Sequence, residues 1–139
     1  MDRARLPSRA LLLAIAALAG CGRYYPLEGQ LVWTDGTPAT ELAGSSVYFE
    51  SAEHRTISRS IVGPDATFRL TTERPEDGVP PGVHRVYVIE SRGGPGESGK
   101  RPPPRIDERF LRPETSGLEV TVPPKEQPVI LKIERAGRR

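Results

Sequence analysis

Short alternating segments, set off by prolines and glycines, limit the fold of this chain more than any other feature. Fifteen prolines and fourteen glycines are spread through its 139 residues, and they would interrupt any long helix. Between these breaks, apolar side chains recur at every second position, which is typical of a strand with one buried face. Seven such segments lie at residues 27–33, 46–50, 56–62, 67–71, 83–90, 117–122 and 129–133. The sequence therefore predicts an all-β domain.

The segment at 83–90 shows how the two faces are assigned. His84 and Val86 fall on the side that we expect to be buried, and Tyr87 falls on the other. One apolar and one polar face per strand is typical of antiparallel sheets that are covered on one side. The segment at 56–62 is less apolar, so we expect an edge strand there. Together the segments predict a seven-stranded antiparallel sandwich of two sheets.

Two regions outside the strands lack this pattern. Residues 91–104 contain four glycines and four prolines, a composition that predicts a long flexible loop. Residues 135–139 are expected to form a basic tail. The β domain is therefore expected to span residues 27–134.

The N-terminus has the layout of an export signal. Arg3, Arg5 and Arg9 come before or at the edge of an uncharged run from residue 10 to residue 19. A basic start, an apolar stretch and small residues before a cut describe a secretory signal. A transmembrane helix is the weaker alternative, because a span needs about 20 apolar residues. The run ends in Leu18-Ala19-Gly20-Cys21, which resembles the lipobox of bacterial lipoproteins.

That resemblance implies that residues 1–20 are a cleaved signal peptide and that Cys21 is lipidated as the first mature residue. Two or three acyl chains, as in that family, would give stable anchoring. A structural thiol is the alternative, but the chain has no second cysteine for a disulfide. Residues 21–26 then form a short tether, of which five residues reach at most about 18 Å. With Gly22 after the cysteine, the resemblance favours the periplasmic side of the outer membrane over the inner membrane.

The charge balance changes when the signal is removed. The whole chain has 20 basic and 18 acidic residues. Residues 1–20 contain three arginines and one aspartate, so the mature chain has 17 basic and 17 acidic residues. A neutral mature chain gives no reason to expect nucleic acid as a partner. Residues 92–112 carry six basic and three acidic residues. We expect a solvated loop there, with contact to anionic lipid or cell-wall polymer as the alternative.

Five stretches match, in order, the strands and turns of one family. They lie at residues 27–38, 43–49, 65–72, 77–86 and 106–118. Together they resemble carboxypeptidase regulatory-like domains, in the form found in small lipoproteins of planctomycete-type bacteria. The resemblance implies a transthyretin-like, or immunoglobulin-like, β-sandwich without carboxypeptidase activity. Ala66 stands where the family has a glycine, so it must adopt a turn conformation that glycine takes freely. His84 stands where an inward tyrosine is usual, and Asp107 replaces a proline.

No pattern in the chain predicts an enzyme. The Gly-x-Ser-x-Gly nucleophile motif is absent, and the best carboxylate pair, Glu76 and Asp77, lies in a turn. The two histidines are isolated from each other: His84 is expected in the core, hydrogen-bonded, and His54 in a solvated loop. Aspartates beside glycine or proline are explained by turns rather than by calcium. We therefore predict no catalytic residue, no metal and no cofactor.

The expected function is that of a membrane-anchored lipoprotein of the cell envelope, acting as a non-catalytic binding or structural module. Its partner would be an envelope protein or a glycan. The alternative is a carbohydrate- or peptidoglycan-binding accessory domain that uses Tyr48 and Tyr87, both on outward faces. We expect these two rings to be isolated from each other, because Tyr48 alternates with Glu50 and Tyr87 with Arg85.

Overall fold

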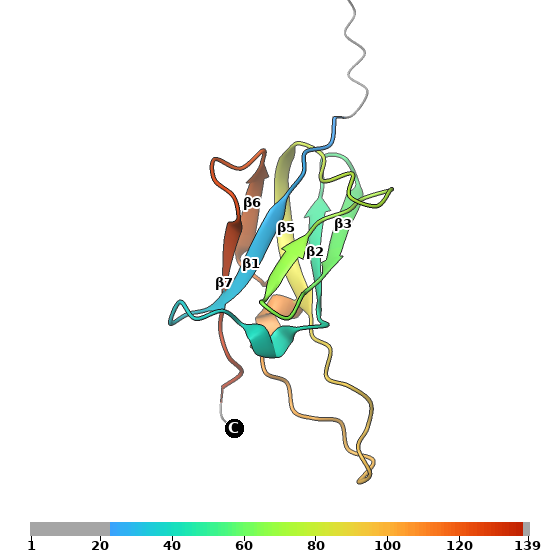
Figure 1. Cartoon of the computed structure of the whole chain (residues 1–139), viewed down its shortest axis with the longest axis vertical. Helices are drawn as coiled ribbons and strands as arrows, with labels where there is room; N and C mark the ends of the chain where they lie inside the picture. The colour runs from blue at the N-terminus through green and yellow to red at the C-terminus, as the bar shows by residue number, and fades with distance from the viewer. Residues whose placement is uncertain (1–22, 138–139) are drawn as a thin grey trace, which may run out of the picture.

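The computed structural model describes residues 23–137 as an all-β unit with two short 3-10 turns (Figure 1). All seven segments predicted from the alternating pattern form strands. The strands are β1 (Glu28–Trp33), β2 (Ser46–Ser51), β3 (Thr56–Ile61), β4 (Thr67–Arg69), β5 (Gly82–Ile89), β6 (Leu118–Val122) and β7 (Val129–Ile133). The 3-10 turns are η1 (Thr40–Leu42) and η2 (Glu108–Leu111). The signal peptide predicted at 1–20, the lipidation site Cys21 and the first residues of the tether lie outside the described residues.

The strands form two sheets, as predicted. One sheet has the order β4-β1-β7 and the other the order β3-β2-β5-β6. The prediction that residues 56–62 form an edge strand is confirmed, because β3 ends the larger sheet. On that side the two sheets are joined by a bridge in which Arg59 and Thr71 exchange backbone hydrogen bonds of 2.8 and 3.0 Å.

One pairing corrects the prediction of a wholly antiparallel sandwich. β1 and β7 are parallel, with Gly29 opposite Val129 and Trp33 opposite Ile133. Alternation of apolar residues is the same in parallel and antiparallel pairs, so it reports the face of a residue and not the strand direction. The first and last strands are also far apart in sequence, and no hairpin turn forces them to run in opposite directions.

The core lies between the two sheets and uses the faces that the sequence predicts. Its buried members include Leu31, Trp33, Val47, Phe49, Phe68, His84, Val86, Val88, Leu131 and Ile133. Two backbone positions make this packing possible. Gly29 lies under the Phe68 ring, where a Cβ atom would collide with it. Ala66 adopts a φ of 65°, which confirms that it takes the left-handed turn conformation expected in place of glycine.

Both ends of the described chain are bonded to the sandwich. Tyr25, which the sequence places in the tether, exchanges backbone hydrogen bonds of 2.8 and 2.9 Å with Val79. Arg135, which it places in the basic tail, forms a bridge with Ile106, and the Ala136 N–H donates to the Arg105 carbonyl at 2.8 Å. The folded unit is therefore longer than the predicted span of 27–134 at both ends. Among residues 23–137, no helix is long and apolar enough to cross a membrane.

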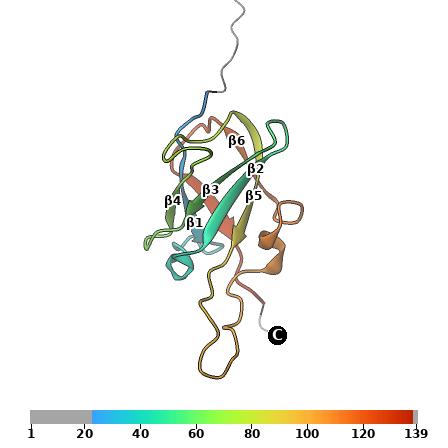
Figure 2. The same ribbon diagram turned by 90° about the vertical axis from the view of Figure 1, so that its right-hand side faces the viewer.

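The molecule has two distinct ends along its long axis (Figures 1 and 2). Residue 23 enters at one end. The loop at 91–104, both 3-10 turns and the C-terminal residues lie at the other end, which we call the distal end. The loop projects away from the sheets, and its tip closes in a tight turn between Gly96 and Lys100.

Candidate binding surface

Tyr48 and Tyr87 face each other directly on the outer face of the larger sheet. Tyr48 of β2 is the register partner of Tyr87 of β5. Their rings are stacked, with centroids 4.9 Å apart and planes inclined by only 9°. Both side chains are half-buried. An offset stack of this kind stabilises a sheet by about 0.5–1.5 kcal/mol beyond the burial of area.

The expectation that these two rings are isolated was wrong. It considered each strand alone, where Tyr48 alternates with Glu50 and Tyr87 with Arg85. The register of the β2–β5 pair places tyrosine opposite tyrosine and Glu50 opposite Arg85. Contacts across a sheet depend on the register of two strands, which the composition of either strand does not determine.

The two rings differ in what lies beside them. On the outer side of Tyr48, the neighbouring strand places Arg59 as its register partner. On the other side of Tyr87, the pairing of β5 with β6 ends one residue earlier, where Val86 lies opposite Leu118. Burial, followed by the nearby Glu50 carboxylate, raises the pKa of Tyr87, so its hydroxyl stays protonated at neutral pH. The Glu114 carboxylate also lies near Tyr87, whereas Tyr48 and Arg59 line a surface pocket of about 430 Å³.

The same face of the sheet carries apolar side chains. Of the six large hydrophobic residues that are exposed within residues 23–137, four belong to this face: Ile57, Ile61, Val83 and Ile89. Ile89 lies two residues beyond Tyr87 on the same side of β5, at the distal end of the strand. On this face of β5, the aromatic pair is therefore followed by an exposed apolar side chain at the distal end.

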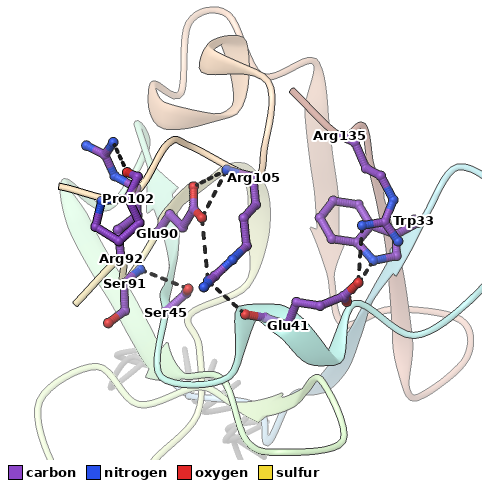
Figure 3. A network of polar contacts seen from close by, with 9 residues as sticks. All are labelled: Trp33, Glu41, Ser45, Glu90, Ser91, Arg92, Pro102, Arg105 and Arg135. Atoms are coloured by element: carbon purple, nitrogen blue, oxygen red, sulfur yellow. Dashed lines mark hydrogen bonds and ion pairs between the residues drawn. The ribbon is translucent and has the colours of Figure 1, made fainter. Parts of the chain in front are cut away.

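Polar side chains join the segments of the distal end (Figure 3). The Glu90 side chain is only 3% exposed, and its two oxygens accept from the Arg105 N–H at 3.1 and 2.9 Å. The Arg105 guanidinium also donates to the Glu41 carbonyl at 3.0 Å. The Ser91 N–H donates to the Ser45 hydroxyl at 3.0 Å. These contacts, which we call the loop clamp, fix both ends of the 91–104 loop to the sandwich.

A second group of contacts in Figure 3 holds the C-terminal segment. The Arg135 guanidinium lies 4.0 Å from the centre of the Trp33 ring and 3.1 Å from a Glu41 carboxylate oxygen. Glu41 also accepts from the Trp33 indole N–H at 3.1 Å. The backbone and these hydrogen bonds lower the pKa of Glu41, which keeps it charged opposite Arg135.

A pocket of about 620 Å³ opens beside the loop clamp. Its walls come from the end of β5, from both arms of the loop and from η2. They include Ile89, Arg92, Arg101, Ile106, Glu108 and Leu111. This volume lies within the range of sites that take small molecules.

His84 is a core residue, as predicted. It is fully buried, and its Nε2 lies 2.8 Å from the Pro80 carbonyl oxygen. Burial lowers its pKa, so the ring is neutral and Nε2 is the donor of this bond. Its Nδ1 has no hydrogen-bond partner in the described part of the chain. His54 is exposed, also as predicted.

The carboxylates that the sequence assigns to turns are engaged there. Burial raises the pKa of Asp77, but the N–H donors of Thr72, Arg74 and Glu73 together outweigh it, and the net shift is downward. Asp77 therefore does not pair with its neighbour Glu76, whose carboxylate lies 3.6 Å from Arg69. Asp35 and Asp65 each accept from a threonine two residues further on. Within residues 23–137, no group of three or more His, Cys, Asp or Glu side chains is placed to hold a metal ion.

Sequence reasoning missed the loop clamp and the pocket. The segments that build them are up to 64 residues apart, as between Glu41 and Arg105. A single acidic residue at the end of the best strand, Glu90, was the only local signal, and alone it is indistinguishable from an exposed strand end. Comparison of the chain with family models, with curated proteins and with solved structures finds no match.

Proposed function

We propose that this protein is a lipoprotein of the bacterial envelope, anchored through lipid on Cys21, whose domain is a non-catalytic binding or structural module. The proposal includes cleavage of residues 1–20, a position on the periplasmic side of the outer membrane, and a carboxypeptidase regulatory-like, transthyretin-like sandwich. It is supported by the Leu18-Ala19-Gly20-Cys21 motif and by the order of the family-like segments.

The observation that carries the proposal is the two-ended shape of the molecule (Figure 1). The chain enters at one end, and Tyr25 is already bonded to the sandwich, so only residues 21–24 are left as a tether. Four residues reach at most about 14 Å. The eight residues of β5 alone extend about 26 Å toward the distal end. Such an anchor would hold the domain close to the membrane and turn the basic loop away from it.

Of the two contacts considered for residues 92–112, anionic lipid and cell-wall polymer, this arrangement favours the polymer. An anchored domain whose loop points away from the bilayer presents Arg92 and Arg101 to the envelope and not to the lipid headgroups of its own membrane. The partner would therefore be a soluble or wall-bound component of the envelope. The engagement of Asp77 in a turn supports a binding role over hydrolysis by the Glu76–Asp77 pair.

Metabolic labelling with a palmitate analogue tests the anchor. The chain is expressed with its own N-terminus, beside Cys21→Ala and the matched control Gly22→Ala. We expect label in the wild type and in Gly22→Ala, and none in Cys21→Ala, because acylation requires the thiol. Label retained by Cys21→Ala would contradict the proposal.

A second candidate function is carbohydrate binding at the Tyr48–Tyr87 pair. The specific observation in its favour is the stack of these two half-buried rings on the outer face of the sheet, beside a pocket of about 430 Å³ that Tyr48 and Arg59 line.

Calorimetry with peptidoglycan fragments and neutral polysaccharides tests this candidate. Stacking of a sugar on this pair predicts that Tyr48→Ala and Tyr87→Ala each weaken the binding by about fivefold or more. Val83→Ala, at an exposed position on the same face of β5, is the control and should leave the affinity unchanged. Absence of saturable binding, or an unchanged affinity in both tyrosine variants, would contradict a sugar site at this pair.

A further inference from the structure

The distal pocket combines apolar walls with cations that lack acidic partners. The arginines near it fall into two groups. Arg105, Arg109 and Arg135 each lie within 4 Å of a carboxylate, on Glu90, Glu134 and Glu41 respectively. Arg92 and Arg101 line the pocket, and neither forms an ion pair within residues 23–137. Two of the unpaired cations at this end therefore face the pocket, while Lys100 and Arg112, which also form no ion pair within residues 23–137, are not part of its walls.

The two cations come from opposite arms of the loop. Arg92 follows the end of β5, and Arg101 precedes the segment that returns to the sandwich. The Arg92 guanidinium donates to the Pro102 carbonyl at 3.2 Å, which ties one arm to the other and orients this side chain across the loop (Figure 3). One bond uses one of the five donors of a guanidinium, so the rest are available to an oxyanion.

The base of the pocket is fixed before any ligand arrives. Glu90 and Arg105 hold the two arms together at the sandwich, and the Glu90 carboxylate is itself paired with the Arg105 N–H and with the Arg105 guanidinium 3.7 Å away. A buried carboxylate that is already paired does not repel an anion as a free one would. A preformed base also reduces the ordering entropy that a ligand would otherwise cost.

We propose that the distal pocket binds a small ligand that carries a carboxylate or a phosphate on a compact apolar body. The anionic group would lie between Arg92 and Arg101, whose planar guanidinium groups match the oxygens of either anion. The apolar body would lie against Ile89 and Leu111, which are exposed in the walls. Glu108, the remaining charged group of the walls, disfavours a second anionic group on the ligand.

This inference deepens the binding role proposed above and depends on the distal site alone. The palmitate experiment tests the anchor independently, so failure of the pocket and failure of the anchor can be told apart.

Titration calorimetry on the full chain tests the pocket. The probes are phenyl phosphate and 3-phenylpropionate, with the neutral 3-phenyl-1-propanol for comparison. We expect one of the two anions to saturate the protein at millimolar concentration or below and the alcohol to bind at least about tenfold more weakly. Tighter binding of phenyl phosphate would assign a phosphate ligand, and the reverse a carboxylate.

Substitutions locate the anion. Arg101→Gln alone, and Arg92→Gln with Arg101→Gln, should weaken binding, the double variant by about tenfold or more. Lys100→Gln is the matched control, because it removes the same charge from the adjacent residue, which is not part of the walls. Its affinity should stay within about twofold of the wild type. Equal losses in Lys100→Gln and Arg101→Gln, equal binding of the alcohol, or no saturable binding of either anion would overturn the inference.

Discussion

At the scale of single residues, the sandwich depends on a few positions where the backbone or a polar group has no room to change. Gly29 passes beneath Phe68, and His84 places an imidazole in a fully buried layer. The glycine stands within a predicted strand, where the alternating pattern did not single it out, and the histidine was predicted on a buried face. Only the structure shows that Phe68 lies over the first, and that the Pro80 carbonyl pairs with the second.

Because Gly29 lies against the Phe68 ring, we expect even one added methyl group at this position to clash. Gly29→Ala places a Cβ atom against the Phe68 ring, so β1 and β4 must separate or the ring must leave its rotamer. We expect a loss of about 1–3 kcal/mol in the free energy of unfolding. Gly96→Ala, where the structure leaves open space, is the control and should be nearly neutral. Equal midpoints of the two variants in urea would contradict the packing described here.

His84 predicts a pH dependence of stability. Burial lowers its pKa in the folded state, so the unfolded chain binds a proton first as the pH falls below about 6.5. Stability is therefore full above that pH and declines on acidification toward the folded-state pKa, by at most about 1.4 kcal/mol per pH unit. Urea unfolding at pH 7 and pH 5 should show this decline in the wild type. In His84→Phe the decline should be smaller, and an equal decline would place the imidazole in solvent.

At the scale of elements, the sequence predicted the strands and their faces well, because alternation is a local property of each segment. All seven strands, the edge position of β3 and the inward face of β5 follow from it. The parallel β1–β7 pair, the stack of Tyr48 on Tyr87 and the loop clamp do not, because each depends on which distant segment lies alongside. The outer limits of the domain were missed for the same reason, since Tyr25 and Arg135 are held by tertiary contacts.

The loop clamp predicts that removal of Glu90 destabilises the protein far more than removal of Glu97 in the same loop. Glu90→Ala leaves the Arg105 N–H without its acceptor in a site where Glu90 is only 3% exposed. We expect a loss of about 1–3 kcal/mol in stability. Glu97→Ala, in the exposed tip of the same loop, removes the same charge and should leave the melting temperature unchanged. Similar effects of both substitutions would mean that the clamp contributes nothing to stability.

At the scale of the whole molecule, the sandwich has two different ends along its long axis. The described chain starts at one end, and the 91–104 loop lies at the other (Figure 2). The pocket, with Arg92 and Arg101 in its walls, belongs to the loop end, and the stacked tyrosines lie on β2 and β5 between the two ends. A short lipid anchor would convert this shape into an orientation, with the pocket directed away from the membrane. The proposed function therefore depends most on the lipid anchor.

Intact mass spectrometry of the mature protein, isolated from membranes, tests that anchor most directly. We expect a chain that begins at Cys21 and carries the added mass of two or three acyl groups. The Cys21→Ala chain should retain residues 1–20 and carry no acyl mass. A mature chain that starts at another residue, or that begins at an unmodified Cys21, would contradict the lipid anchor.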